Sequence, residues 1–101
     1  MKIIISENQE MDVKNKFIFM LLNSMNYDLK YLDRFIMFNR IGHTNEIVYS
    51  EQDNVCFVYK TLINLIYSYT TFNFDTIKNA IVIWVENVLE KKVDIVYINQ
   101  Y

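Results

Sequence analysis

The sequence predicts a mainly α fold of the α+β class, in which four amphipathic helices are joined by short terminal and central β-strands. Apolar residues recur at helical spacing over four long stretches, and residues that favour helix ends stand at the boundaries of those stretches. The length of 101 residues is that of one domain. We therefore expect a single helical binding domain over residues 1–101, with the element order β-α-α-β-α-α-β.

A strand and a helix are predicted at the start of the chain. Residues 2–5 are apolar and rich in isoleucine, which favours a short strand. Ser6 and Gln9 then have the spacing of a capping box, and apolar residues follow at helical intervals. The prediction is a helix over residues 7–24.

A second helix is expected over residues 29–40. Its apolar residues recur at three- and four-residue spacing, and Asn26 or Asp28 can cap its start. Gly42, the only glycine of the chain, follows its end, where a left-handed residue commonly closes a helix. A short central strand over residues 46–49 is predicted next.

The most regular apolar stripe of the chain predicts a third helix. Ser50 and Asp53 can cap it, and the stripe extends over residues 55–70. Short letter strings also recur between the two halves of the chain, such as IISEN with VYSEQ and NYD with NFD. Either a duplication with a pseudo-two-fold axis or repeated use of the same capping residues explains this similarity.

The fourth helix has the clearest start. Asn73 precedes an apolar stripe over residues 74–89 and is a favoured N-cap residue. Trp84 lies on that stripe and is expected in the core, with a partner for its indole N–H. Residues 93–98 are rich in β-branched residues and predict a final strand.

Few residues of the chain suit catalysis or metal binding. The only histidine, His43, lies in a predicted turn, and the only cysteine, Cys56, lies in an apolar pattern typical of buried positions. Zinc sites need several such ligands at short spacing, and phosphate-binding loops need several glycines. We expect no enzyme, no catalytic residues, no cofactor and no metal, and a single cysteine excludes an intramolecular disulfide.

Charge and hydropathy limit the partners. The net charge is −2, and the ten basic residues are scattered rather than clustered, so we expect no nucleic-acid binding. The apolar runs fall far short of the ~20 residues that span a bilayer, and the first residues do not resemble a signal peptide. The expectation is a cytoplasmic protein that does not enter a membrane.

Several large apolar residues interrupt the polar stripes of the predicted helices. Either strands and loops cover them, or they form a surface for a partner protein, since aromatic residues and methionine are favoured in interface cores. Biased composition also explains part of this surplus, because isoleucine, asparagine and tyrosine are abundant while alanine and glycine each occur once. The apolar candidates for partner binding are Phe19, Met37, Phe57, Tyr67 and Val82.

Acidic residues at the predicted helix starts form a second candidate surface. If the two halves are related by pseudo-symmetry, these carboxylates form one patch that would attract a basic partner. The acidic candidates are Glu7, Glu10, Asp12, Glu51 and Asp53.

These features favour a non-enzymatic protein that binds another protein. The leading interpretation is an immunity or antitoxin type of inhibitor that neutralises a toxin by direct binding. One alternative is a viral or phage antagonist of a host protein. Bcl-2-like helical inhibitors are similar in size and in the apolar run around Trp84, but their NWGR segment is absent. The other alternative is a homodimeric structural or regulatory subunit.

Overall fold

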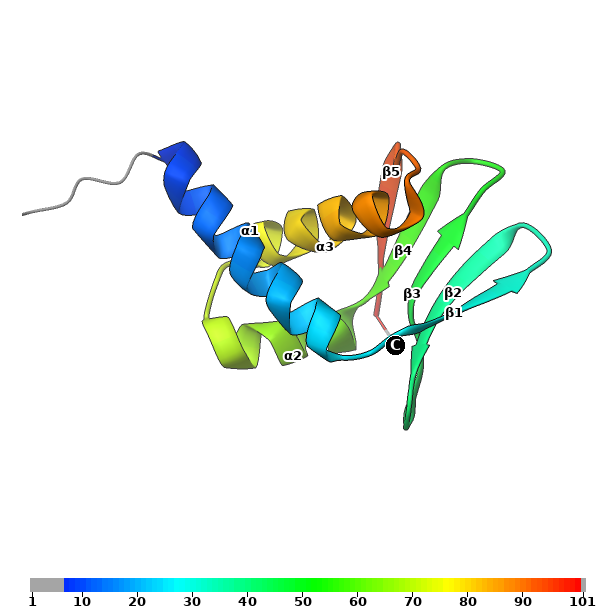
Figure 1. Ribbon diagram of the computed structural model, residues 1–101, viewed down its shortest axis with the longest axis horizontal. Helices are drawn as coiled ribbons and strands as arrows, with labels where there is room; N and C mark the ends of the chain where they lie inside the picture. Colours follow the sequence, from blue (N-terminus) through cyan, green and yellow to red (C-terminus); the bar gives the residue numbers. More distant parts are fainter. Residues whose placement is uncertain (1–6, 101) are drawn as a thin grey trace, which may run out of the picture.

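The computed structural model describes residues 7–100, apart from the side chains of residues 7–9 and 43–45. This part of the chain forms three helices and five strands (Figure 1). The predicted strand over residues 2–5 lies outside the described residues. In chain order the elements are α1 (Glu7–Ser24), β1 (Asp28–Leu32), β2 (Phe35–Arg40), β3 (His43–Ser50), β4 (Val55–Tyr59), α2 (Lys60–Thr70), α3 (Phe74–Leu89) and β5 (Ile95–Asn99).

The five strands form one mixed sheet with the spatial order β1-β2-β3-β4-β5. Neighbouring strands are antiparallel from β1 to β4, and β5 runs parallel to β4. A parallel pair needs a long crossover between its strands, and α2 with α3 supplies that crossover. The prediction of four helices in a mainly α arrangement is therefore wrong.

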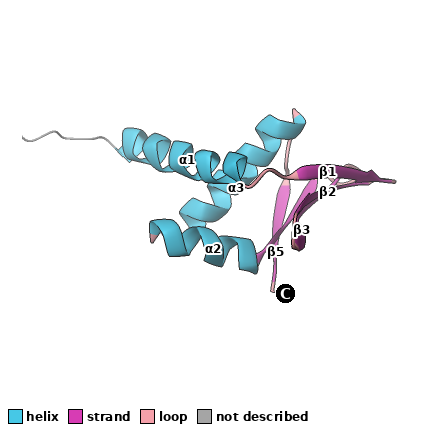
Figure 2. Cartoon of the chain, turned by 60° about the horizontal axis from the view of Figure 1, so that its bottom comes forward, coloured by secondary structure: helices cyan, strands magenta, loops and turns pink. Residues whose placement is uncertain are grey.

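All three helices lie on one side of the sheet (Figure 2). Alternate strand residues point toward them, among them Phe38 of β2, Tyr49 of β3 and Val58 of β4, which are fully buried. The helices contribute the other half of the core, mainly from α2 and α3. Trp84 belongs to this core, and its Nε1 donates to Asn23 Oδ1 of α1 at 2.8 Å, so the prediction for Trp84 is confirmed.

The predicted second helix is a β-hairpin. Asp33 and Arg34 form the turn between β1 and β2, and Asp33 adopts a left-handed backbone with φ of 55°. Gly42 has φ of 79° and lies in the turn between β2 and β3. The left-handed residue predicted there is present, but it closes a hairpin and not a helix.

The predicted third helix begins five residues too early. Residues 55–59 form β4, and α2 starts only at Lys60. Ser50 and Asp53 do not cap a helix, since Ser50 ends β3 and Asp53 lies in the turn between β3 and β4. Residues 55–59 are extended because their backbone forms hydrogen bonds with β3 and β5. This pairing outweighs the helical spacing of the apolar residues in this segment.

The first and fourth predicted helices are present as α1 and α3, and the predicted final strand is present as β5. Helix α1 has the expected bounds, and α3 starts after Asn73, whose Oδ1 accepts from Thr76 N at 2.8 Å. β5 overlaps the predicted final strand but begins two residues later and ends one residue later. The two halves of the described chain have different element orders, α-β-β-β and β-α-α-β, so the pseudo-two-fold repeat is not present.

Candidate functional site

The side of the sheet opposite the helices carries a broad apolar surface, which we call the outer face. Its residues alternate along each strand with the residues of the core, and the strand register aligns them in two rows across the sheet. One row is Lys30, Met37, Val48, Phe57 and Tyr97, and the other is Leu32, Phe35, Ser50, Val55 and Ile95.

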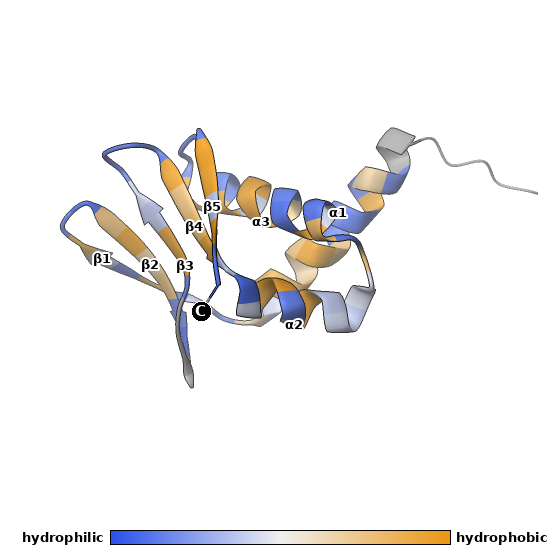
Figure 3. Cartoon of the chain, turned by 180° about the vertical axis from the view of Figure 1, so that it is seen from behind, coloured by the Kyte–Doolittle hydropathy of each residue, from blue (hydrophilic) through white to orange (hydrophobic). Residues whose placement is uncertain are grey.

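Most of the outer face is apolar although none of the three helices within residues 7–100 covers it. Only Lys30 and Ser50 of the ten residues are polar. The exposed fraction is 57% for Leu32, 43% for Phe35 and 48% for Ile95. Apolar residues dominate β2, β4 and β5, while the turns between strands are hydrophilic (Figure 3). Contiguous exposed apolar surface of this kind is typical of interaction sites.

A depression of about 590 Å³ lies in this face near the turn between β3 and β4. Ser50 and Val55 line it and are almost completely buried. Larger side chains surround them, and the polar groups of the turn form part of the rim. The surrounding residues are Phe35, Gln52, Asp53, Phe57, Ile95 and Tyr97.

Two aromatic rings form one wall of the depression. Phe57 of β4 stacks on Tyr97 of β5, with ring centroids 5.7 Å apart and an angle of 23° between the ring planes. The parallel register places the two residues directly opposite each other. Stacking of neighbours on adjacent strands limits the rotamers of both rings, so this wall is preorganised for contact.

Hydrogen bonds between turns hold the edge of the face nearest the depression. Arg34 of the β1–β2 turn donates to Gln52 Oε1 of the β3–β4 turn at 2.5 Å. Asn54 donates through Nδ2 to Asp94 Oδ2 at 3.2 Å and accepts from Tyr49 Oη at 3.0 Å. These contacts link three segments that are distant in sequence, so the rim of the depression has a defined shape.

Of the predicted apolar candidates, only Met37 and Phe57 lie on the outer face. Phe19 is half-buried on α1 and packs against the core, so it is not a free surface residue. Tyr67 on α2 is exposed, and Val82 on α3 is half-buried, and both lie on helices away from the outer face.

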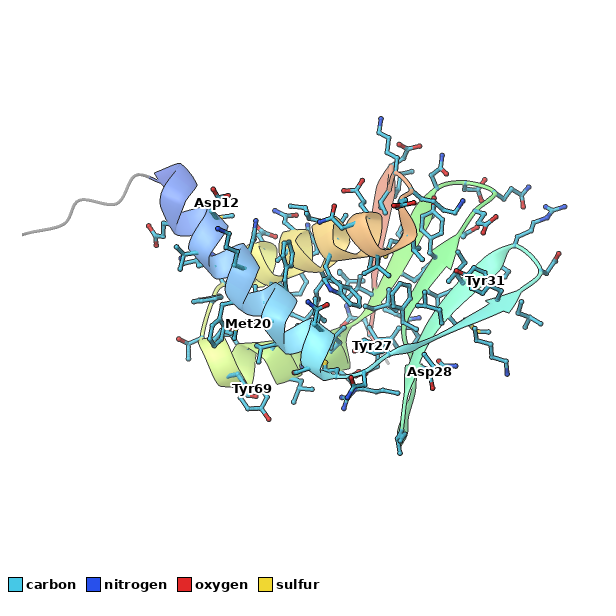
Figure 4. The ribbon with its side chains drawn as sticks, viewed as in Figure 1. Asp12, Met20, Tyr27, Asp28, Tyr31 and Tyr69 are labelled. Carbon is cyan, nitrogen blue, oxygen red and sulfur yellow. The ribbon has the colours of Figure 1, made fainter. Side chains whose placement is uncertain are left out.

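The predicted acidic candidates do not form one patch. Glu7, Glu10 and Asp12 lie at the start of α1, at the far end of the molecule from the sheet (Figures 1 and 4). Glu51 and Asp53 lie in the turn between β3 and β4. The molecule is 55 Å long, and without a pseudo-two-fold axis nothing brings the two groups together. Asp53 alone joins the outer face, at the rim of the depression.

Six further apolar residues of the outer face were not predicted as surface residues. Each lies within a predicted helix or strand: Leu32, Phe35, Val48, Val55, Ile95 and Tyr97. The available signal was the unbroken apolar run in three segments, FIMF, VCFVY and IVYI. Such runs are typical of strands that are apolar on both faces.

A second apolar strip lies on α1. Val13, Phe17 and Met20 recur at helical spacing and were part of the stripe that predicted this helix. They are exposed, whereas Ile18 and Leu22 are fully buried against the other helices. Figure 4 shows Met20 on α1, well away from the sheet. This strip lies on a helix and is separate from the outer face.

The buried carboxylate of Glu46 has structural partners. Glu46 accepts from Arg40 Nε at 2.5 Å and Arg40 Nη2 at 3.2 Å, and from Tyr27 Oη at 2.9 Å. Burial and the charge of Glu46 raise the pKa of Tyr27. Burial, with a smaller effect from the charge of Glu86, raises the pKa of Cys56 to about 12. A thiol with this pKa is protonated at neutral pH and is a poor nucleophile.

Within residues 7–100, no three side chains of His, Cys, Asp or Glu gather where they could hold a metal ion. None of the helices in the same range is both long enough and apolar enough to cross a membrane. Comparison with known proteins finds no matching family model, no similar curated protein and no similar solved structure.

Proposed function

We propose that this protein acts without catalysis and binds another protein through the outer face of its sheet. One observation carries the proposal: the sheet is apolar on both sides, but helices cover only one of them. Strands with unbroken apolar runs are typical of sheets covered on both faces. A partner on the outer face would supply the missing cover and gain the hydrophobic free energy of burying it.

The depression defines what such a partner presents. Its apolar walls suit a large aliphatic or aromatic side chain that inserts between Phe35 and the stacked pair of Phe57 and Tyr97. Asp53 at the rim suits a lysine or arginine next to that side chain. The partner is therefore expected to present a large apolar side chain with a lysine or arginine beside it.

For the class of partner we keep the order that the sequence suggests. A toxin neutralised by direct binding comes first, and a host protein sequestered by a viral or phage antagonist comes second. The acidic patch that would have met a basic toxin is reduced to Asp53 and its neighbour Glu51, so the apolar face carries most of the expected affinity. The cytoplasm is the compartment that we propose.

The test is co-expression with the product of the neighbouring reading frame, followed by size exclusion with light scattering. A one-to-one complex and relief of toxicity are the expected results for the wild type. Phe35→Ser and Leu32→Ser should then weaken binding at least about tenfold, because they remove exposed apolar area from the outer face. Their melting temperatures should stay near that of the wild type.

The matched control is Tyr67→Ser, because Tyr67 is comparably exposed but lies on α2. Binding by this variant should equal that of the wild type. Asp53→Asn should slow association and reduce its dependence on salt, since it removes the charge at the rim. If Tyr67→Ser weakens the complex while Phe35→Ser does not, the partner binds the helices and the proposal is wrong.

A further inference from the structure

The β5 strand forms one edge of the sheet. It pairs with β4 on one side, and no strand of the described chain lies on its other side. Its sequence, IVYIN, contains no charged residue and no proline. Edge strands usually carry such residues, because an uncharged edge is a template for pairing with another strand.

The opposite edge is protected in the usual way. β1 carries Asp28 and Lys30, both exposed, in a strand of the same length. Lys30 and Tyr97 occupy the two ends of the same row across the outer face. The fold therefore places a lysine at one end of the row and a tyrosine at the other, and of the two edge strands within residues 7–100 only β5 lacks a charged residue.

The sequence of β5 is complementary to itself in antiparallel orientation. With a two-fold axis at Tyr97, Val96 lies opposite Ile98 of a second copy, and Tyr97 lies opposite its own equivalent. Val96 and Ile98 both belong to the core side of the sheet, so their pairing extends the core across the axis. Asp94 then lies opposite Gln100, and no two like charges meet.

A shifted register is less suitable. An axis at Val96 would place the carboxylate of Asp94 opposite the apolar side chain of Ile98. The register centred on Tyr97 thus pairs Val96 with Ile98 on the core side and Ile95 with Asn99 on the outer side, and it leaves the charge of Asp94 at the ends, opposite Gln100.

We propose that two copies of this chain associate through their β5 strands, antiparallel and centred on Tyr97. The contact is isologous, as in most homodimers, and joins the two sheets into one. It also brings the two outer faces side by side, with a Phe57–Tyr97 stack on each side of the axis. The inference does not depend on the proposed function, because it concerns the purified chain alone.

Light scattering of the purified full chain, up to about 0.1 mM, tests the association. The expected mass for the wild type is twice the chain mass of 12.2 kDa. Tyr97→Lys places two like charges opposite each other and should give the mass of one chain. Tyr31→Lys is the matched control, because Tyr31 is an exposed tyrosine of the other edge strand, and its mass should equal that of the wild type.

A cross-linking experiment tests the register. Only the residue on the axis meets its own equivalent, at the Cα separation of roughly 4.5–5.5 Å that a disulfide accepts. In a Cys56→Ala background, Tyr97→Cys should form covalent dimers on mild oxidation with diamide. Ile95→Cys should not, because its equivalent would be about 13 Å away along the strands.

Circular dichroism should match the wild type for Tyr97→Lys and Tyr31→Lys, since both tyrosines are exposed. The two cysteine variants are compared with Cys56→Ala alone, because Cys56 is buried. A wild-type chain that stays monomeric over the whole range, or a Tyr97→Lys variant that keeps the doubled mass, would overturn the proposal. Cross-linking through Ile95→Cys but not through Tyr97→Cys would overturn the register. Because no partner is present, these outcomes are distinct from a failure of the proposed function.

Discussion

Glu46 is the residue whose environment is most unusual for its type. Its side chain is 6% exposed, yet it accepts hydrogen bonds from Arg40 and Tyr27. These two donors come from β2 and from the segment between α1 and β1, so one carboxylate links three parts of the chain. A buried carboxylate is tolerated only when its charge and its lone pairs are matched in this way.

We expect Glu46→Ala to destabilise the protein by about 1–3 kcal/mol, because it leaves the partly buried Arg40 guanidinium without its counter-charge. Tyr27→Phe should cost only about 1 kcal/mol, since the ion pair remains. Urea unfolding measures both. Glu51→Ala is the control, because Glu51 is exposed in a turn, and it should change stability by less than about 0.5 kcal/mol. Equal costs for Glu46→Ala and Glu51→Ala would mean that Glu46 is solvated in solution.

At the scale of elements, the turn between β3 and β4 is the connection with most side-chain support. Asn54 has a left-handed backbone with φ of 54°, and its side chain bonds Tyr49 and Asp94. Its carbonyl also accepts from Asp94 N at 2.8 Å. The turn is thereby attached to the segment that leads into β5, which keeps β4 and β5 in register.

Two substitutions separate the backbone and side-chain roles of Asn54. Asn54→Gly keeps the left-handed backbone and loses the side-chain bonds, so it should cost about 1–2 kcal/mol. Asn54→Ala should cost about 1 kcal/mol more, because alanine is strained in that conformation. Asn26→Gly is the control, since Asn26 has the same φ but no side-chain bond of this kind. Equal stability of the Asn54→Gly and Asn54→Ala variants, measured by urea unfolding, would contradict this account.

At the scale of the whole molecule, one buried thiol and two buried phenol groups make the stability depend on pH in the alkaline range. Burial raises the pKa of Cys56 to about 12 from an ordinary value of 9.0, and raises the pKa of Tyr27 and Tyr49 above 10.0. Each of these groups keeps its proton in the folded state at a pH where the unfolded chain has lost it. The folded state then binds more protons, so stability falls as the pH rises.

We expect the urea midpoint to be unaffected by these groups below pH 9.0 and to fall steadily between pH 9.0 and about 12. Cys56→Ala should reduce the slope in the lower part of this range, because it removes the group with the lowest unfolded pKa. The native thiol should also resist thiol reagents at pH 8 and react after unfolding. A slope unchanged by Cys56→Ala would show that the tyrosines alone control alkaline stability.

The elements that the sequence predicts correctly are those whose determinants are local. Asn73 caps α3 within four residues of itself, and α1 has its expected bounds. Gly42 has the expected positive φ, although the turn belongs to a hairpin. Capping and left-handed turns depend on a residue and its immediate neighbours, so the sequence contains the necessary information.

The two wrong helices have the same cause. Residues 35–38 and 55–59 are apolar on both faces of the sheet, so they lack the alternation by which a half-exposed strand is recognised. Without that alternation, their three- and four-residue spacings match a helix equally well. The outer face is therefore both the candidate site and the reason why the fold class was predicted wrongly.

The candidate site was found only in part for a related reason. Met37 and Phe57 were selected as apolar residues on polar faces of helices, and both lie on the outer face, but as strand residues. Phe35 and Tyr97 could not be joined to them, because strand pairing brings them together from distant parts of the chain. The acidic patch failed because it depended on a repeat that the fold does not have.

The sequence by itself determined the bounds of α1 and α3, the absence of an intramolecular disulfide, and the surplus of large apolar side chains. The tertiary structure alone decided which of those side chains are buried in the core and which form the outer face. Capping and turn conformations depend on contacts a few residues apart, whereas sheet faces depend on hydrogen bonds between strands that are far apart in the chain. A strand that is apolar on both sides does not specify which side the helices will cover, and only packing against α2 and α3 makes that choice.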